Sequence, residues 1–283
     1  MSMNMGMTFQ YFTYFLNPLE QPALFKDKRD KNDILRDLLR KDRIEYESHG
    51  ANLAFVLIHE KNNYFIGRLG KKASIRRNLP PEQNFEETLE ESWPHCTVII
   101  NTNPDHGTGQ KIAFEYKSNV FTSSHEQLKH FQDELNSHLF SFGYALSINP
   151  VTEEREFWHI IDQNKDKIER LTFTFNAPNL FGINNSLNQD LKDLQKEYSS
   201  TKVSLELENP DGRLVVPKND LTKQSVEYIT QGGGEYSLKI KGKVRKVLKS
   251  KDNIKSKTFD DLEIVVKGKG QETLFDILAK IFE

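Results

Sequence analysis

The sequence has a single cysteine, Cys96, among its 283 residues. A lone thiol excludes an intramolecular disulfide and every metal site that needs two cysteine ligands. So little cysteine is typical of proteins of the reducing cytosol, and we therefore expect a cytoplasmic location. Cys96 opens an apolar stretch, which predicts a buried thiol.

Long apolar runs and targeting signals are also missing. The longest uninterrupted apolar run, Leu53–Ile58, has six residues, whereas a membrane-spanning helix needs about 20. The N-terminus has no basic region followed by an apolar one, so it does not resemble a signal peptide. The four methionines stand at positions 1, 3, 5 and 7, and we expect residues 1–7 to be a disordered start.

What the sequence does contain is an alternation of strand-like and helix-like segments. Residues 52–60 and 64–69 are apolar and are separated by a three-residue turn, which predicts a β-hairpin. A capping box at 123–126 precedes an amphipathic helix, whose apolar stripe consists of Leu128, Phe131, Leu135, Leu139 and Phe142. Because strands and helices interleave and hairpins join several strands, we expect an α+β fold with mainly antiparallel sheets.

A polar segment that ends near Arg170 is the best candidate for an internal boundary. We expect two subdomains, an N-terminal α+β unit at 8–165 and a C-terminal α+β unit at 166–283. The second unit contains the most distinctive stretch of the chain, a basic strand at 235–249. It ends in an amphipathic helix at about 271–282.

Basic residues are concentrated in the stretch 236–257. It carries nine basic residues and one acid, Asp252, in a chain whose net charge is −2. Apolar and basic residues alternate at its start, which is the period of a half-buried strand. Alternate strand residues lie about 6.6 Å apart, roughly twice the 3.4 Å rise along one DNA strand. One face could therefore address several phosphates, although such lysines also fit a solvated edge strand that resists aggregation.

We therefore predict a surface that binds the double-stranded DNA backbone through two basic segments. The C-terminal candidates are Lys239, Lys241, Lys243, Arg245, Lys246, Lys249 and Lys251. The second cluster, in a stretch without acids between 66 and 79, consists of Arg68, Lys71, Lys72, Arg76 and Arg77. Five glutamates follow between 82 and 91, where we expect a helix. They either pair with the basic cluster or limit what the basic surface binds.

A nuclease is the alternative from a different class. Asp105 precedes Glu115 and Lys117 on an apparent strand, which resembles the PD-(D/E)xK pattern of Mg²⁺-dependent nucleases. Two carboxylates would hold the metal ion while the lysine stabilises developing charge. Outside this alternative we expect no cofactor and no metal site, because His125 and His130 are five residues apart and cannot share one helical face.

The order of these motifs resembles the RexA phage-exclusion proteins of temperate phages over roughly residues 9–182. The resemblance lies in Phe9–Tyr14, Gly50–Asn52 with the apolar hairpin that follows through Tyr64–Phe65, Trp93–Pro94, Ile112–Phe114, Thr122–Ser124, Ile148–Val151 and Phe173–Gly182. It implies a non-enzymatic, sequence-nonspecific DNA-binding effector of phage exclusion or anti-phage defence by abortive infection. It also implies a homodimer that acts with a membrane-protein partner.

The sequence is therefore compatible with three functions. The first is the RexA-like DNA-binding effector, and the second is the Mg²⁺-dependent nuclease. The third is a protein-binding scaffold, on which the lysines only keep an edge strand soluble. The Glu115-x-Lys117 pair is not part of the RexA pattern, which favours the first.

Overall fold

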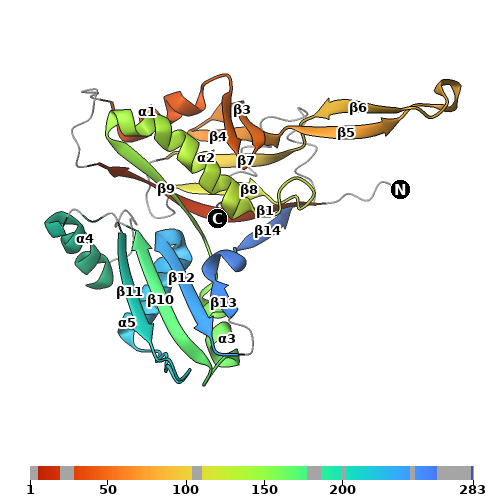
Figure 1. Ribbon diagram of the computed structural model, residues 1–283. Coiled ribbons are helices and arrows are strands. Elements are labelled where there is room, and N and C mark those ends of the chain that lie inside the picture. Colours follow the sequence, from red (N-terminus) through yellow and green to blue (C-terminus); the bar gives the residue numbers. More distant parts are fainter. Residues whose placement is uncertain are drawn as a thin grey trace.

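The structure, a computed structural model, is an α+β fold with two larger antiparallel sheets and one two-stranded sheet (Figure 1). This confirms the fold class expected from the interleaved strand and helix patterns. The residues that it describes are 6–19, 29–103, 110–176, 186–198, 200, 202–242, 246–259 and 282. Within them, no helix has both the length and the apolar composition needed to cross a membrane.

The first sheet contains eight strands in the order β14-β1-β8-β7-β4-β3-β2, with β9 also paired to β1. Their bounds are β1 Met7–Pro18, β2 Ile44–Ser48, β3 Ala51–Lys61, β4 Tyr64–Lys71, β7 His95–Asn101, β8 Lys111–Glu115, β9 Tyr144–Pro150 and β14 Ser256–Phe259. The long strand β1 organises this sheet, because it pairs with β14, β8 and β9 along its twelve residues. The hairpin predicted from residues 52–69 is β3–β4.

Two helices, α1 Lys31–Leu39 and α2 Ser124–Leu139, cover one face of the first sheet. The hydroxyl of Ser123 accepts the N–H of Glu126 at 3.2 Å, so α2 begins where the capping box predicts. The predicted stripe is buried against the sheet from Leu128 to Leu139. Its last member, Phe142, lies in the short 3₁₀ turn Phe140–Phe142 and is partly buried.

The second sheet has the order β11-β10-β12-β13. Its strands are β10 Ile168–Asn176, β11 Lys202–Glu208, β12 Gly234–Ile240 and β13 Lys246–Lys249. Helices α3 Glu154–Gln163, α4 Ser186–Tyr198 and α5 Asp220–Tyr228 contribute to a second core on one face of this sheet. A short π-helical turn, Ile229–Gly233, joins α5 to β12.

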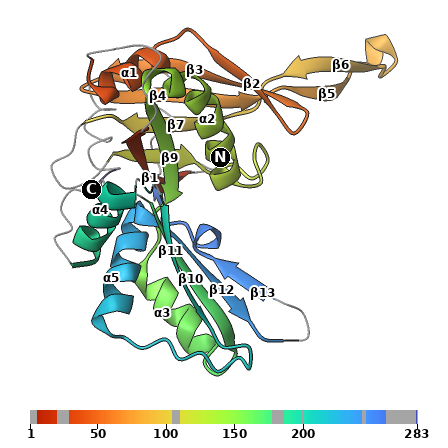
Figure 2. The ribbon, with the colours of Figure 1, turned by 60° about the vertical axis from the view of Figure 1, so that its left-hand side comes forward.

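A two-stranded arm projects from the first sheet, as both views show (Figures 1 and 2). It consists of β5 Ala73–Asn78 and β6 Glu87–Ser92, with a 3₁₀ turn at Pro81–Gln83 between them. The prediction of a helix across the glutamates at 82–91 was therefore wrong. Six cross-strand pairs with β5 hold this segment extended, and such tertiary pairing overrides local helix preference.

The chain returns from the second sheet to the first near its end. After the 3₁₀ turn Ser250–Asp252, β14 pairs with β1 in the register Met7↔Phe259 to Gln10↔Ser256. Thus β14, which falls within the expected unit 166–283, belongs to the first sheet, and Met7 belongs to β1 although we expected no fold for 1–7. Residues 1–5 and the predicted last helix, apart from Phe282, lie outside the described residues.

Candidate nucleic-acid interface

The basic stretch is a hairpin followed by a further strand, not the single strand predicted at 235–249. Tyr236, Leu238 and Ile240 of β12 are buried, as the alternation predicts. Strand β13 pairs antiparallel with β12, so that Lys239 lies opposite Val247. Lys243 and Arg245 lie outside the described residues. The predicted basic face is therefore divided between strands with different neighbours.

Three of the predicted phosphate-binding lysines have partners within the protein. The Lys239 Nζ lies 2.7 Å from Glu169 Oε2, and the Lys241 Nζ donates to the Asp211 carbonyl at 2.9 Å. The Lys251 Nζ lies 2.5 Å from an oxygen of Glu126 on α2. This hydrogen bond raises the pKa of Lys251 and lowers that of Glu126. These lysines therefore stabilise the second sheet and its contact with α2.

The segment 246–257 supplies an edge strand to each of the two larger sheets. Strand β13 is the last strand of the second sheet and β14 is the end strand of the first (Figure 1). The side chains of Lys249, Lys255 and Lys257 are exposed along this segment, and Lys246 lies at the start of β13. These lysines belong to one basic segment of the sequence, and in the fold this segment passes from the second sheet to the first.

Most of the second basic cluster lies on the arm. Lys72, Arg76 and Arg77 are exposed and form ion pairs with β6. The distances are 2.7 Å for Lys72–Glu91, 3.6 Å for Arg76–Glu87 and 3.5 Å for Arg77–Glu90. The hydrogen bond from Lys72 is the main reason that the pKa of Glu91 is lowered. Of the two alternatives for the acidic stretch, the structure therefore shows pairing with the basic cluster.

Arg68 and Lys71 lie on β4 below the arm. Arg68 lines an open groove of about 320 Å³ together with Val56, Gly70 and Trp93. Its guanidinium has no ion-pair partner among the described residues, whereas Arg43 on the same groove pairs with Glu45 at 2.9 Å. Lys71 is exposed at the base of the arm.

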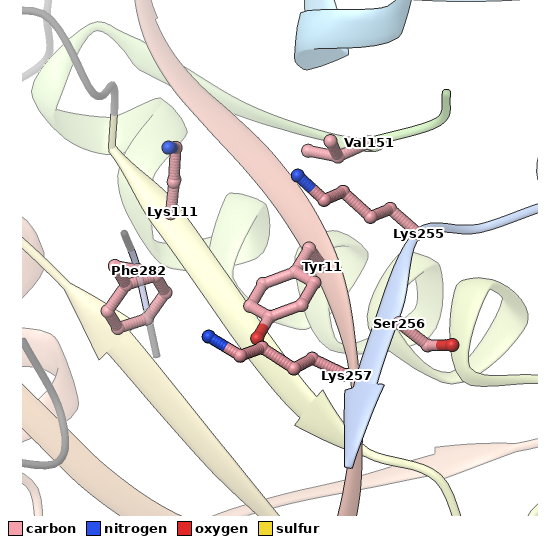
Figure 3. A pocket seen from close by; sticks show the side chains of 7 residues that line it. All are labelled: Tyr11, Lys111, Val151, Lys255, Ser256, Lys257 and Phe282. Carbon is pink, nitrogen blue, oxygen red and sulfur yellow. The ribbon is translucent and has the colours of Figure 1, made fainter. Parts of the chain in front are cut away.

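The structure also brings together residues that sequence reasoning missed. Tyr11 of β1, Lys111 of β8 and Phe282 line a cavity of about 190 Å³ with Lys255 and Lys257 (Figure 3). The basic run pointed to the last two lysines. Lys111 and Tyr11 carry no such signal, because only the strand order β14-β1-β8 brings them into the same part of the sheet as Lys257.

Glu115 and Lys117, the two nuclease candidates among the described residues, form an ion pair with each other. Glu115 is 2% exposed; its Oε2 accepts the N–H of Thr97 at 2.8 Å, and its Oε1 lies 2.7 Å from the Lys117 Nζ. Asp105 lies outside the described residues. Among the side chains that the structure places, no three His, Cys, Asp or Glu groups are gathered as a metal site would require.

The chain matches no protein-family model, and neither a curated protein nor a solved structure is significantly similar to it. The resemblance to the RexA family stays a prediction, based on the motifs of residues 9–182.

Proposed function

We propose that this protein is a non-enzymatic, sequence-nonspecific DNA-binding effector of phage exclusion or anti-phage defence, acting in the cytosol. The observation that carries the proposal is that the lysine-rich segment 246–257 supplies one end strand to each of the two larger sheets and exposes Lys249, Lys255 and Lys257 along its length. Phosphate contacts from such an edge would position the protein on a duplex without reading its sequence.

The charge pattern of this segment supports backbone binding. Between 246 and 257 the only acid is Asp252, which accepts the backbone N–H of Lys249 at 3.0 Å. Lys257 lies in β14 and Lys255 directly precedes this strand. Because the two residues are separated by one position of extended chain, their side chains leave the same face about 6.6 Å apart. The ion pairs of the arm make Lys72, Arg76 and Arg77 weaker candidates.

A triple Lys→Gln substitution at Lys249, Lys255 and Lys257 tests the proposal. Each lysine that touches a phosphate contributes about 0.9 to the slope of log K against log salt, and its replacement by glutamine should remove that contribution. We therefore expect a slope reduced by about 2.7 and a similar fall in affinity for unrelated duplexes. The matched control is Lys72→Gln, Arg76→Gln and Arg77→Gln, which removes the same charge from the arm. An unchanged slope in the edge variant would reject the proposal.

The same protein preparation separates the three classes of function. On supercoiled plasmid, a DNA-binding effector retards the DNA and leaves it intact with or without Mg²⁺. A nuclease nicks it only with Mg²⁺, and the absence of that cleavage in a folded Glu115→Gln variant would support this alternative. A protein-binding scaffold leaves the plasmid unretarded and intact.

We also propose a homodimer and, following the RexA resemblance, a membrane-protein partner. The arm is the candidate contact between two copies, because Ile75, Phe85 and Leu89 on it are 50%, 64% and 71% exposed. The register Ile75↔Glu90 and Arg76↔Leu89 directs Ile75 and Leu89 to opposite faces of the arm, and exposed large apolar side chains such as these can be buried by a contact between copies. A dimer would double the lysine edges available to one DNA molecule and so raise avidity.

A further inference from the structure

The cavity beside β14 is built on one face of the first sheet. Strand β1 pairs with β8 in the register Tyr11↔Ala113 and Thr13↔Lys111, and with β14 through Phe9↔Lys257. Alternate residues of a strand point to the same face. Tyr11, Lys111 and Lys257 therefore lie on one face of three neighbouring strands, and Lys255, which directly precedes β14, also lines the cavity.

The hydroxyl group of Tyr11 is the feature of this cavity that points to a ligand. The residue is 6% exposed, and its hydroxyl is buried without a hydrogen-bond partner in the part of the chain that the structure describes. Figure 3 shows the Tyr11 side chain among the residues that line the cavity, which include Lys257. Burial raises the pKa of Tyr11 to about 12, so the phenol keeps its proton at neutral pH and can donate a hydrogen bond. A buried donor without an acceptor is costly and calls for a ligand or another explanation.

The charge and size of the cavity limit which ligand can supply a hydrogen-bond acceptor to the Tyr11 hydroxyl. Three lysines line it, and none of the described lining residues is acidic. Val151 and Phe282 form apolar walls, which exclude part of the solvent and strengthen attraction to an anion. Its volume of about 190 Å³ lies below the roughly 300 Å³ at which pockets for drug-sized ligands begin. It suits a phosphate group whose attached molecule remains outside.

We propose that this cavity binds a terminal phosphate group, with the Tyr11 hydroxyl donating a hydrogen bond and Lys111, Lys255 and Lys257 supplying the counter-charge. The phosphate can belong to a free mononucleotide or to the 5′ end of a nucleic-acid strand. The proposal shares Lys255 and Lys257 with the suggested DNA-binding edge, but it does not depend on duplex binding.

Titration calorimetry with inorganic phosphate, adenosine 5′-monophosphate and adenosine tests the site. We expect heat of binding for the first two and none for adenosine. Tyr11→Phe removes only the hydroxyl and should weaken phosphate binding roughly tenfold or more, since hydrogen bonds to charged groups are strong. Without phosphate, the Tyr11→Phe variant should unfold at the same temperature as the wild type or at a higher one, because the hydroxyl that it lacks has no partner among the described residues.

Two further measurements separate the sources and the two proposals. Tighter binding of a 5′-phosphorylated duplex than of the same duplex without the phosphate assigns the site to a strand end; tighter binding of the mononucleotide than of inorganic phosphate assigns it to a free nucleotide. Lys249→Gln, outside the cavity, should lower duplex affinity and leave phosphate binding unchanged. No phosphate binding by the wild type, or equal binding by a folded Tyr11→Phe variant, would overturn the proposal.

Discussion

Gly234, the first residue of β12, occupies a position where the neighbouring backbone leaves no room for a side chain. An ideal Cβ there would lie 1.9 Å from the carbonyl oxygen of Thr174 on β10. That oxygen is part of the sheet and cannot rotate away. We expect Gly234→Ala to lower the free energy of unfolding by about 3 kcal/mol, measured by urea unfolding followed by circular dichroism.

Gly70→Ala is the control for this prediction. A Cβ at residue 70 would meet its nearest atom, the His95 Cβ, at 3.5 Å, which is ordinary contact. The expected change in unfolding free energy is below about 1 kcal/mol. Similar destabilisation of both variants would show that glycine's backbone freedom, and not space, sets the cost.

At the level of single residues, periodicity predicts burial well. Cys96 is fully buried as expected, and burial raises the pKa of its thiol to about 12. Periodicity does not say which partner a buried or half-buried side chain meets. Lys239 has the expected position on its strand, yet its ion pair with Glu169 depends on the pairing of β10 with β12.

The arm is the element with the clearest consequence for assembly. Replacing Phe85 by Asn suits the positive φ of 56° at that residue, and replacing Leu89 by Thr keeps a good strand former. If the arm joins two copies, light scattering at micromolar concentration should give about twice 32.9 kDa for the wild type and about 32.9 kDa for this double variant.

Val215→Ser provides the matched control, because Val215 is 78% exposed and lies outside the arm. It should leave the measured mass unchanged. A wild type with the mass of one chain would remove the basis for the dimer proposal.

The arm also shows where element prediction from sequence stops. Capping chemistry located the start of α2, because Ser123 and Glu126 interact within a few residues. The glutamates at 87–91 have good helix propensity, and their strand conformation comes from pairing with 73–78. Local preference was overridden by a partner strand that the sequence pattern did not assign.

At the scale of the whole molecule, two side-chain hydrogen bonds connect the start of α2 to the second sheet and to the segment after it. Glu126 meets Lys251, and Glu235 Oε1 lies 3.2 Å from His125 Nε2. Hydrogen bonds from these partners lower the pKa of both carboxyl groups. The unfolded chain therefore binds more protons where carboxyl groups titrate, so stability rises with pH there.

The contacts of Glu126 and Glu235 should make their full contribution to the free energy of unfolding above about pH 5. This contribution should disappear as the pH falls through the lowered pKa values of the two carboxyl groups. We expect the unfolding free energy of the wild type to decline more steeply below pH 5 than that of Glu126→Gln/Glu235→Gln. Parallel pH profiles of the two proteins would contradict this account.

The arrangement of the sheets relative to the sequence is the part of the fold that the sequence patterns did not predict. The two larger sheets have separate cores, and α3, which lies before the expected boundary at residue 165, packs in the second of them. The pairing of β14 with β1 joins residues about 250 positions apart. Alternating patterns specify which face of a strand is apolar, but they do not specify its neighbour.

The arm begins and ends at the same place in the body. Gly70 pairs with His95, and the N–H of Lys71 donates to the Pro94 carbonyl at 3.0 Å, so β4 and β7 are already adjacent where the arm departs. In topological terms, residues 72–93 are an insertion into a hairpin. Because lengthening a loop costs little entropy, the reach of the arm can change between related chains while the sheet beneath it stays the same.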